Sequence, residues 1–421
     1  MMRWFTDAKF GVIIHWGLYS ILGGEWKGNH IPDVCEWIMH TARIPYAEYR
    51  KLVNLFDPIH FNADRWMQDI NRYGCKYVCF TAKHHDGFAM YDSKVSEYNV
   101  MHTPFGRDIL REIAVSCRKY GMKFCVYYSQ MQDWAEPDGA GNTWDYDPDK
   151  KNFKRFFYGK VIPQVTELLT NYGEIGLIWF DTPYDMPINL CRELRDTVKR
   201  LQPDCLINGR IGYGLGDYRQ MTDNCIPAKN YEKPWETPMT LNGTWGYSHK
   251  DRQWKKADDV LYRLADITGK GGNLLLNIGP DAMGTIPEES SRILTSVGKW
   301  LEINGESIYG AESTIEMPYC IPWGACTMKR GHLYLHVFKY PVTHIVCLFN
   351  LKIDIKRITL LDGGDELKYI QTYEPARNED RLRIYLPKKL PDTLDTVIDV
   401  EYKGDIHAVS LETLDSIYNA N

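Results

Sequence analysis

The segment Gly176–Asp181, with the sequence GLIWFD, is an apolar run that ends in a carboxylate. Similar short apolar runs are spread over the chain before residue 280, at Phe10–His15, Tyr77–Ala82, Lys123–Ser129, Cys205–Asn208 and Asn273–Ile278. Near-continuous apolar runs of this length are typical of parallel strands that are covered on both faces. The sequence therefore predicts a parallel sheet as the framework of the first part of the chain.

Amphipathic stretches with ordinary helix start and stop signals separate these runs. The expected helices are Ala63–Tyr73, Asp108–Tyr120, Val161–Tyr172, Leu190–Leu201, Ala257–Thr268 and Glu288–Ile303. Alternating strands and helices predict an α/β fold, and the register suits a (β/α)8-like barrel. Only six strands can be placed, because the polar and aromatic segment Gly209–Asp251 has no clear periodicity. Long irregular segments in a compact domain are usually functional loops.

The pattern changes after Ala311, where short and partly alternating runs follow one another without a helical pattern between them. The expected strands are His332–Tyr340, His344–Leu351, Ile355–Leu361, Leu367–Gln371, Arg381–Leu386 and Thr396–Tyr402. This pattern predicts a C-terminal antiparallel β-sandwich. We therefore divide the chain into a catalytic barrel, residues 1–311, and a sandwich, residues 312–421.

Composition narrows the classes of partner. The 421 residues carry a formal net charge of -5, and no basic run with interleaved aromatics occurs, so we expect no nucleic-acid partner. No apolar stretch reaches the ~18 residues that a membrane span needs, so we expect no membrane partner. The 13 Trp and 28 Tyr favour a carbohydrate site, because sugar C–H faces pack on aromatic rings, although a large core also uses aromatics. The sequence leaves the oligomeric state open.

The 11 cysteines include no C-x-x-C pair, which argues against a zinc ribbon and indicates buried free thiols in a reducing compartment. The chain begins with Met1–Phe5, MMRWF, which is not a signal-peptide pattern. We therefore expect a cytoplasmic protein. A removed signal peptide replaced by a start methionine would leave the same sequence.

Polar side chains close successive apolar runs. His15 ends the first run, His84 and His85 follow the second, Asp181 ends the fourth and Arg210 follows the fifth. Catalytic groups of barrel enzymes gather where strands end, so we expect one functional pocket there. Asp181 is the candidate nucleophile. An N-cap role for this aspartate is disfavoured, because the next helix is expected to begin only near residue 190.

The His84-His85-Asp86 sequence invites a metal site, since zinc binds histidine and carboxylate ligands. Adjacent residues of a strand point to opposite faces, however, so both histidines cannot easily bind one ion. We expect neither a metal nor a cofactor.

Several blocks, taken together, resemble the glycoside hydrolase family 29 α-L-fucosidases. They are residues 8–17 (AKFGVIIHWG), 36–37 (EW), 83–88 (KHHDGF), 127–129 (YYS), 133–134 (DW), 179–181 (WFD), 235–237 (WET), 245–247 (WGY) and 272–280 (GNLLLNIGP). The blocks follow the family order over most of the first 310 residues. The resemblance implies retaining, metal-free hydrolysis of terminal α-L-fucose from fucosylated oligosaccharides or glycoconjugates, with Asp181 as the nucleophile that forms a covalent fucosyl-enzyme.

The resemblance leaves the acid/base residue less certain. The family commonly shows Thr-Pro-Glu where this chain has Met221-Thr222-Asp223, so Asp223 is favoured, with Glu236 and Glu232 as rivals. The residues that the resemblance implies for fucose binding are His15, Glu36, Trp37, His84, His85, Tyr128, Trp179 and Arg210. Tyr127 is an alternative to Tyr128, because adjacent strand residues alternate in direction.

Two other functions are compatible with these residues. A non-catalytic carbohydrate-binding barrel would keep the pocket without the chemistry, and the lack of a glutamate at position 223 leaves room for it. A metal-dependent barrel hydrolase is the other alternative, and sensitivity to a chelator would favour it.

Overall fold

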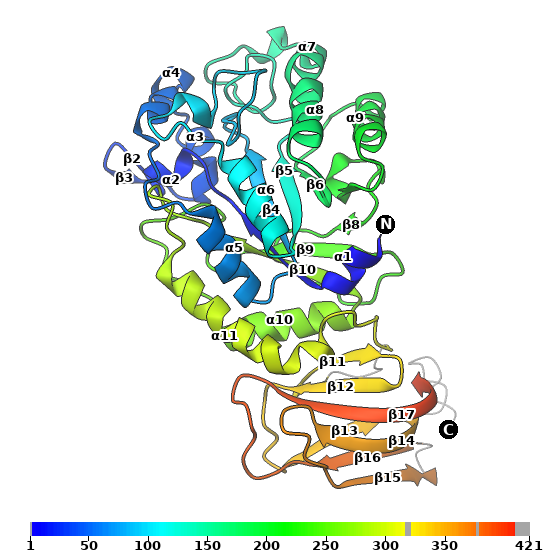
Figure 1. Ribbon diagram of the computed structural model, residues 1–421. Coiled ribbons are helices and arrows are strands. Elements are labelled where there is room, and N and C mark those ends of the chain that lie inside the picture. Colours follow the sequence, from blue (N-terminus) through cyan, green and yellow to red (C-terminus); the bar gives the residue numbers. More distant parts are fainter. Residues whose placement is uncertain (1, 316–320, 376–378, 409–421) are drawn as a thin grey trace.

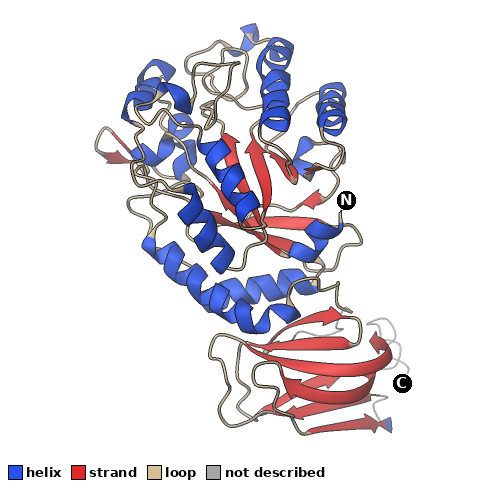
Figure 2. Ribbon diagram, in the orientation of Figure 1, coloured by secondary structure: helices blue, strands red, loops and turns tan. Residues whose placement is uncertain are grey.

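The computed structural model describes residues 2–315, 321–375 and 379–408. Its larger part is an eight-stranded sheet with the strand order β7-β6-β5-β4-β1-β10-β9-β8, in which all neighbours are parallel (Figures 1 and 2). The strands are β1 (Phe10–Ile14), β4 (Tyr77–Lys83), β5 (Lys123–Tyr128), β6 (Leu177–Phe180), β7 (Leu206–Ile207), β8 (Arg219–Gln220), β9 (Trp235–Met239) and β10 (Gly272–Ile278).

The sheet is curled, and its two ends meet. The backbone N–H of Asp217, two residues before β8, donates to the carbonyl oxygen of Ile207 in β7 at 2.7 Å. The Asp217 carboxylate in turn accepts the N–H of Ile207 at 2.8 Å. The predicted barrel-like α/β fold is therefore confirmed.

Helices cover the outside of this sheet (Figure 2). The long ones are α5 (Ala63–Arg72), α6 (Ile109–Lys119), α8 (Ile162–Asn171), α9 (Ile188–Leu201), α10 (Ala257–Gly269) and α11 (Glu288–Asn304). The shorter ones are α1 (Arg3–Ala8), α2 (Tyr19–Leu22), α3 (Ile38–Thr41), α4 (Tyr46–Tyr49) and α7 (Phe153–Phe156), and a small hairpin joins β2 (Glu25–Trp26) to β3 (Asn29–His30). The predicted helices agree closely; α5, for example, begins behind Asn62, whose side chain accepts the N–H of Arg65 at 2.9 Å.

Alternate residues of the strands fill the barrel interior. One buried cluster contains Ile13, Tyr77, Tyr127, Trp179 and Leu275, which all point inward. Their strand neighbours, such as Tyr128 and Phe180, belong to the other cluster between sheet and helices. This alternation decides which side chain of each strand reaches the open end of the barrel.

The C-terminal part packs a four-stranded sheet, β11-β12-β17-β14, on a three-stranded sheet, β13-β16-β15. Its strands are β11 (Gly324–Lys329), β12 (His332–Val337), β13 (Ile345–Phe349), β14 (Leu351–Leu360), β15 (Tyr369–Glu374), β16 (Glu379–Tyr385) and β17 (Thr396–Ala408). All pairs are antiparallel, as predicted, and β11 is an additional strand. The division at residues 311 and 312 stays a prediction, and residues 316–320, 376–378 and 409–421 of the second part lie outside the described residues.

Two further observations concern the described residues. None of their helices combines the length and the apolar character needed to span a bilayer. Their ten cysteines are free thiols, and eight of these are buried.

Candidate active site

A cavity of about 340 Å³ opens at the carboxyl ends of the barrel strands. Its lining residues come from the ends of β1, β4, β6 and β7 and from the loops that follow them. They are His15, Asp33, Val34, Glu36, Trp37, His84, Trp179, Asp181, Thr182, Arg210, Asp223 and Trp245. Concave sites of this size are typical of small-molecule pockets.

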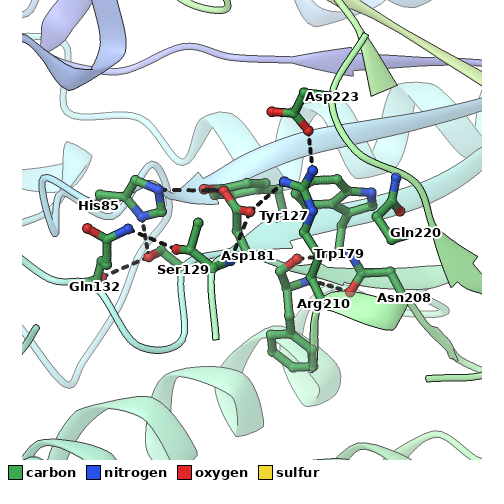
Figure 3. A network of polar contacts seen from close by, with 12 residues as sticks. His85, Tyr127, Ser129, Gln132, Trp179, Asp181, Asn208, Arg210, Gln220 and Asp223 are labelled. Carbon is green, nitrogen blue, oxygen red and sulfur yellow. Dashed lines mark hydrogen bonds and ion pairs between the residues drawn. The ribbon is translucent and has the colours of Figure 1, made fainter. Parts of the chain in front are cut away.

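Asp181 is the first residue after β6, and its carboxylate lies at the centre of a polar network (Figure 3). Oδ1 accepts a hydrogen bond from Arg210 Nη1 at 2.7 Å and another from the backbone N–H of Thr182 at 2.9 Å. Oδ2 accepts from the hydroxyl of Tyr127 at 2.9 Å and lies 3.5 Å from Nε2 of His85.

This environment keeps Asp181 ionised. Burial by itself raises the pKa of the carboxyl group, but the positive charge of Arg210 and its hydrogen bond to Asp181 outweigh burial and hold the pKa far below its ordinary value. A carboxylate nucleophile has to be in its charged form, and these contacts supply that form.

A short hydrogen-bond chain orients His85. The hydroxyl of Ser129 donates to the carbonyl oxygen of Gln132 at 2.8 Å, and the same hydroxyl oxygen lies 2.6 Å from Nδ1 of His85 (Figure 3). A carbonyl oxygen can only accept, so the Ser129 proton is committed to it and Nδ1 of His85 must donate to Ser129. With Nδ1 in contact with Ser129, the other ring nitrogen, Nε2, faces Asp181.

The two adjacent tyrosines of β5 have different places, and the prediction of Tyr128 as a sugar-binding residue is wrong. The hydroxyl of Tyr128 donates to Gln164 on α8 at 2.9 Å, outside the barrel, because this residue points away from the interior. Tyr127, the alternative, points inward and donates to Asp181. It also stacks on the ring of Trp179 at 5.4 Å.

Asp223 lies at the rim of the cavity and shares the guanidinium of Arg210 with Asp181. Arg210 contacts Asp181 through Nη1 and Asp223 through Nη2 (Figure 3). The side chain of Asp223 is 40% exposed, compared with 11% for Asp181. Burial raises the pKa of Asp223, and the charge of Arg210 offsets this effect only in part. One guanidinium thus holds a charged carboxylate inside the pocket and a more readily protonated carboxyl group at its mouth.

The two rival carboxyl groups lie elsewhere. Glu236 is in β9 and is fully buried in the barrel interior, where it accepts from Tyr77 at 2.6 Å and from Nε1 of Trp179 at 3.0 Å. Burial raises the pKa of Glu236 to about 7. Glu232 is exposed in the loop before β9. Neither residue lines the cavity.

The remaining predicted residues converge on the cavity. Nδ1 of His15 pairs with Oδ1 of Asn277 at 2.7 Å, and burial lowers the pKa of His15 to about 4. Glu36 accepts the N–H of Gly246 at 2.8 Å, and burial raises its pKa to about 7. Trp37, His84 and Trp179 also line the cavity. Neutral histidines and a polar carboxyl group suit hydrogen bonding to sugar hydroxyls.

Two expectations about individual side chains need correction or extension. The rings of His84 and His85 lie 4.3 Å apart, because β4 ends at Lys83 and the strand alternation does not continue into the turn. Asp33, Val34, Thr182 and Trp245 line the cavity without having been proposed. Of these, only Trp245 carried a signal in the sequence, as part of the WGY block.

Among the described residues, no group of three or more His, Cys, Asp or Glu side chains is arranged to hold a metal ion.

Comparisons with known proteins show the family of this chain. A model of the alpha-L-fucosidase family matches residues 1–306. The tissue alpha-L-fucosidase of Mus musculus is 30% identical over 427 aligned residues, which cover 95% of this chain and 90% of the relative. The structure of an alpha-L-fucosidase from Vibrio sp. strain EJY3 is 34% identical with a TM-score of 0.91, covering 97% of this chain and 74% of that chain.

A further solved structure bears on the chemistry. The structure of an alpha-L-fucosidase from Bacteroides thetaiotaomicron is 28% identical with a TM-score of 0.85, and the match covers 96% of each chain. It is a trapped covalent intermediate in complex with 2-fluoro-fucosyl fluoride.

A barrel that presents an ionised aspartate in a sugar-sized cavity, with relatives of this kind, is a glycoside hydrolase. More specifically, the chain belongs to the alpha-L-fucosidase family, glycoside hydrolase family 29.

Proposed function

We propose that this enzyme releases terminal α-L-fucose from fucosylated oligosaccharides or glycoconjugates by a retaining, two-step mechanism. The observation that carries the proposal is the ionised carboxylate of Asp181 at the floor of the cavity, held by Arg210 and Tyr127. Membership of the family supports fucose as the sugar, and the geometry supports the roles proposed for the two carboxyl groups.

In the first step, a carboxylate oxygen of Asp181 attacks C1 of fucose while Asp223 donates its proton to the glycosidic oxygen. The bond between C1 and that oxygen breaks, the aglycone leaves as an alcohol, and an ester forms between Asp181 and C1. In the second step, Asp223 takes a proton from water, the water oxygen attacks C1, and the ester bond breaks to regenerate Asp181.

The carboxyl pair supports this assignment. Retaining glycosidases hold their two carboxyl groups about 5–5.5 Å apart. Asp181 and Asp223 are bridged by a single guanidinium, which keeps them close together. The covalent intermediate of the Bacteroides relative is a further argument for a double displacement.

The nucleophile is tested with Asp181→Ala and an aryl α-L-fucoside. We expect turnover to be lost by several orders of magnitude, and added azide to restore part of it by attacking C1 from the vacated side. The product of the rescued reaction should be β-L-fucosyl azide, identified by NMR. An Asp181→Ala variant that keeps its activity without azide would contradict the proposal.

The acid/base role is tested by comparing leaving groups. Asp223→Ala should slow substrates with poor leaving groups by roughly 10²- to 10⁴-fold and spare activated aryl fucosides. In the wild-type enzyme, kcat/KM should fall as pH rises through the elevated pKa of Asp223, because the acid must carry its proton. Glu236→Gln and Glu232→Ala are the matched controls. If either control shows the leaving-group dependence and Asp223→Ala does not, our assignment is wrong.

A further inference from the structure

A second cavity, of about 450 Å³, lies beside the catalytic one. It is formed mainly by the loops after β9 and β10 and by the first residues of α11, so it also opens at the carboxyl ends of the strands. Its lining residues include Asn242, Trp245, Tyr247, Arg252, Trp254 and Asn277.

The two cavities share a wall. Trp245 lines both of them. Asn277 holds this wall in place. Its Nδ2 donates to the carbonyl oxygen of Trp245 at 2.6 Å, and its Oδ1 pairs with Nδ1 of His15, a residue of the catalytic cavity, at 2.7 Å. Gly279 packs so closely that a Cβ there would lie 2.6 Å from the same carbonyl oxygen. The relative placement of the two cavities is therefore rigid.

The second cavity is also connected to the acid/base residue. Asn224, the neighbour of Asp223, accepts the backbone N–H of Thr240 at 3.0 Å and its hydroxyl at 3.2 Å. The N–H of Asn224 donates to the carbonyl oxygen of Pro238 at 2.9 Å. The segment 238–242, which leads into the second cavity, thus anchors the turn that carries Asp223. The carboxyl group proposed to protonate the leaving group is therefore carried by a turn that is bonded to this segment.

The lining has the chemistry of a saccharide site. Trp245, Tyr247 and Trp254 offer ring surfaces for the C–H faces of sugars, and Asn242 and Arg252 offer polar groups for hydroxyls. Among the charged lining residues, Glu289 is paired with Arg292 at 2.7 Å, which leaves two carboxylates, Asp281 and Glu288, and one cation, Arg252. A surplus of negative charge disfavours anionic sugars, because like charges repel across an interface.

From these observations we infer that the second cavity binds the neutral saccharide to which the fucose is attached. The inference rests on the proposed function and adds the place where the aglycone binds: fucosylated oligosaccharides, and not simple fucosides, make use of both cavities. Aryl fucosides reach only the first.

The test compares two kinds of substrate with the full-length enzyme. Tyr247→Ala and Arg252→Ala are assayed with 4-nitrophenyl α-L-fucoside and with a panel of neutral fucosyl oligosaccharides of different linkage, including 2′-fucosyllactose and 3-fucosyllactose. We expect kcat/KM for the best oligosaccharide to fall roughly three- to tenfold, chiefly through KM, and the value for the aryl fucoside to change less than about twofold. Tyr247→Phe keeps the ring and should retain the oligosaccharide activity.

The matched control is Tyr369→Ala, which replaces a partly exposed tyrosine of the sandwich. It should leave kcat/KM for both substrates unchanged. The inference is overturned if both cavity variants leave both substrates unchanged, or if they slow both substrates equally. It is also overturned if the wild-type enzyme hydrolyses the aryl fucoside but no oligosaccharide of the panel, a result that would still support the proposed retaining cleavage of α-L-fucosides. If the wild-type enzyme hydrolyses neither the aryl fucoside nor any oligosaccharide of the panel, the proposed function is rejected.

The negative charge of the second cavity can be tested separately. A sialylated derivative of the best oligosaccharide should be hydrolysed more slowly than its neutral parent. Equal or faster hydrolysis would contradict the assignment of a neutral saccharide.

Discussion

The carboxyl group of Glu236 is surrounded by three donors, from Tyr77, Trp179 and Tyr218. Burial nevertheless raises its pKa from 4.5 to about 7, so the folded protein binds a proton there that the unfolded chain releases at a lower pH. The resulting stabilisation is fully present below about pH 4.5 and is lost as pH rises toward about 7.

We therefore expect Glu236→Gln to weaken the loss of stability between these pH values. The wild-type free energy of unfolding should fall, relative to that of the variant, by at most about 3 kcal/mol over this interval. Urea unfolding at a series of pH values measures the difference, with the exposed Glu232→Gln as control. Curves for Glu236→Gln and wild type that run parallel would contradict the raised pKa.

At the level of single residues, the sequence predicts which polar residue closes an apolar run better than it predicts the direction of a side chain. Asp181 and Arg210 could be found because each comes directly after a strand or close behind it. The choice between Tyr127 and Tyr128 depends on which of the two points into the barrel. Two adjacent tyrosines give no sequence signal for this, because both residues are equally aromatic and polar. Glu236 lies in a segment that looks irregular in the sequence, and its burial depends on partners that are far away along the chain.

A buried ion cluster joins three elements around the site. Asp133, in the loop after β5, lies 2.9 Å from Lys83 at the end of β4 and 2.9 Å from Lys160 in the π-helical turn Phe157–Val161. All three side chains are buried. Next to Asp133, the N–H of Trp134 donates to the carbonyl oxygen of His85 at 2.7 Å. The cluster therefore holds the loop that positions His85.

Asp133→Asn should destabilise the protein by about 3–5 kcal/mol, because it removes the carboxylate that contacts the buried ammonium group of Lys83 and leaves Lys160 paired with Glu136 alone. Chemical denaturation measures this loss. Asp64→Asn, which breaks an exposed pair with Lys119, is the control and should change the free energy of unfolding far less, because solvent screens that pair. Equal effects of the two substitutions would show that the cluster does not stabilise the fold.

At the level of elements, the apolar runs and helix ends located six strands and the long helices of the barrel within a few residues. The two missing strands, β8 and β9, were not recognised for physical reasons. β8 has two residues, and β9 reads WETPM, in which a carboxylate and a proline interrupt the apolar pattern. β9 is recognisable as a strand only from its parallel pairing with β8 and β10.

The barrel and the sandwich meet at the C-terminal end of α10 (Figure 1). The carbonyl oxygen of Gly269 accepts the N–H of Thr314 at 2.7 Å, and a Cβ on Gly269 would lie 2.1 Å from the carbonyl oxygen of Cys326 in β11. Nearby, Nε1 of Trp300 donates to the carbonyl oxygen of Asp395 at 2.8 Å. The two parts of the molecule are therefore packed backbone against backbone.

Gly269→Ala should loosen this contact, because the added methyl group has no room. Overpacking costs typically about 1–3 kcal/mol, so we expect the melting temperature to fall by roughly 3–10 °C, with kcat/KM on an aryl fucoside nearly unchanged. Calorimetry also shows whether the two parts then unfold separately. Gly159→Ala, where a Cβ meets no atom within 4 Å, is the matched control. A wild-type melting temperature for Gly269→Ala would contradict the tight contact.

For the whole molecule, the alternation of strands and helices followed by strands alone was enough to predict both architectures and their order. It could not predict how the parts contact each other. That contact depends on a glycine at the end of a helix whose significance appears only when β11 lies against it.

The single guanidinium between Asp181 and Asp223 has a consequence for timing. In the proposed mechanism, esterification of Asp181 removes one of the two negative partners of Arg210. The whole positive charge then acts on Asp223, and it favours the anion at the stage when Asp223 must accept a proton from water. Formation of the ester at Asp181 would thus, through the shared arginine, favour the change of Asp223 from acid to base.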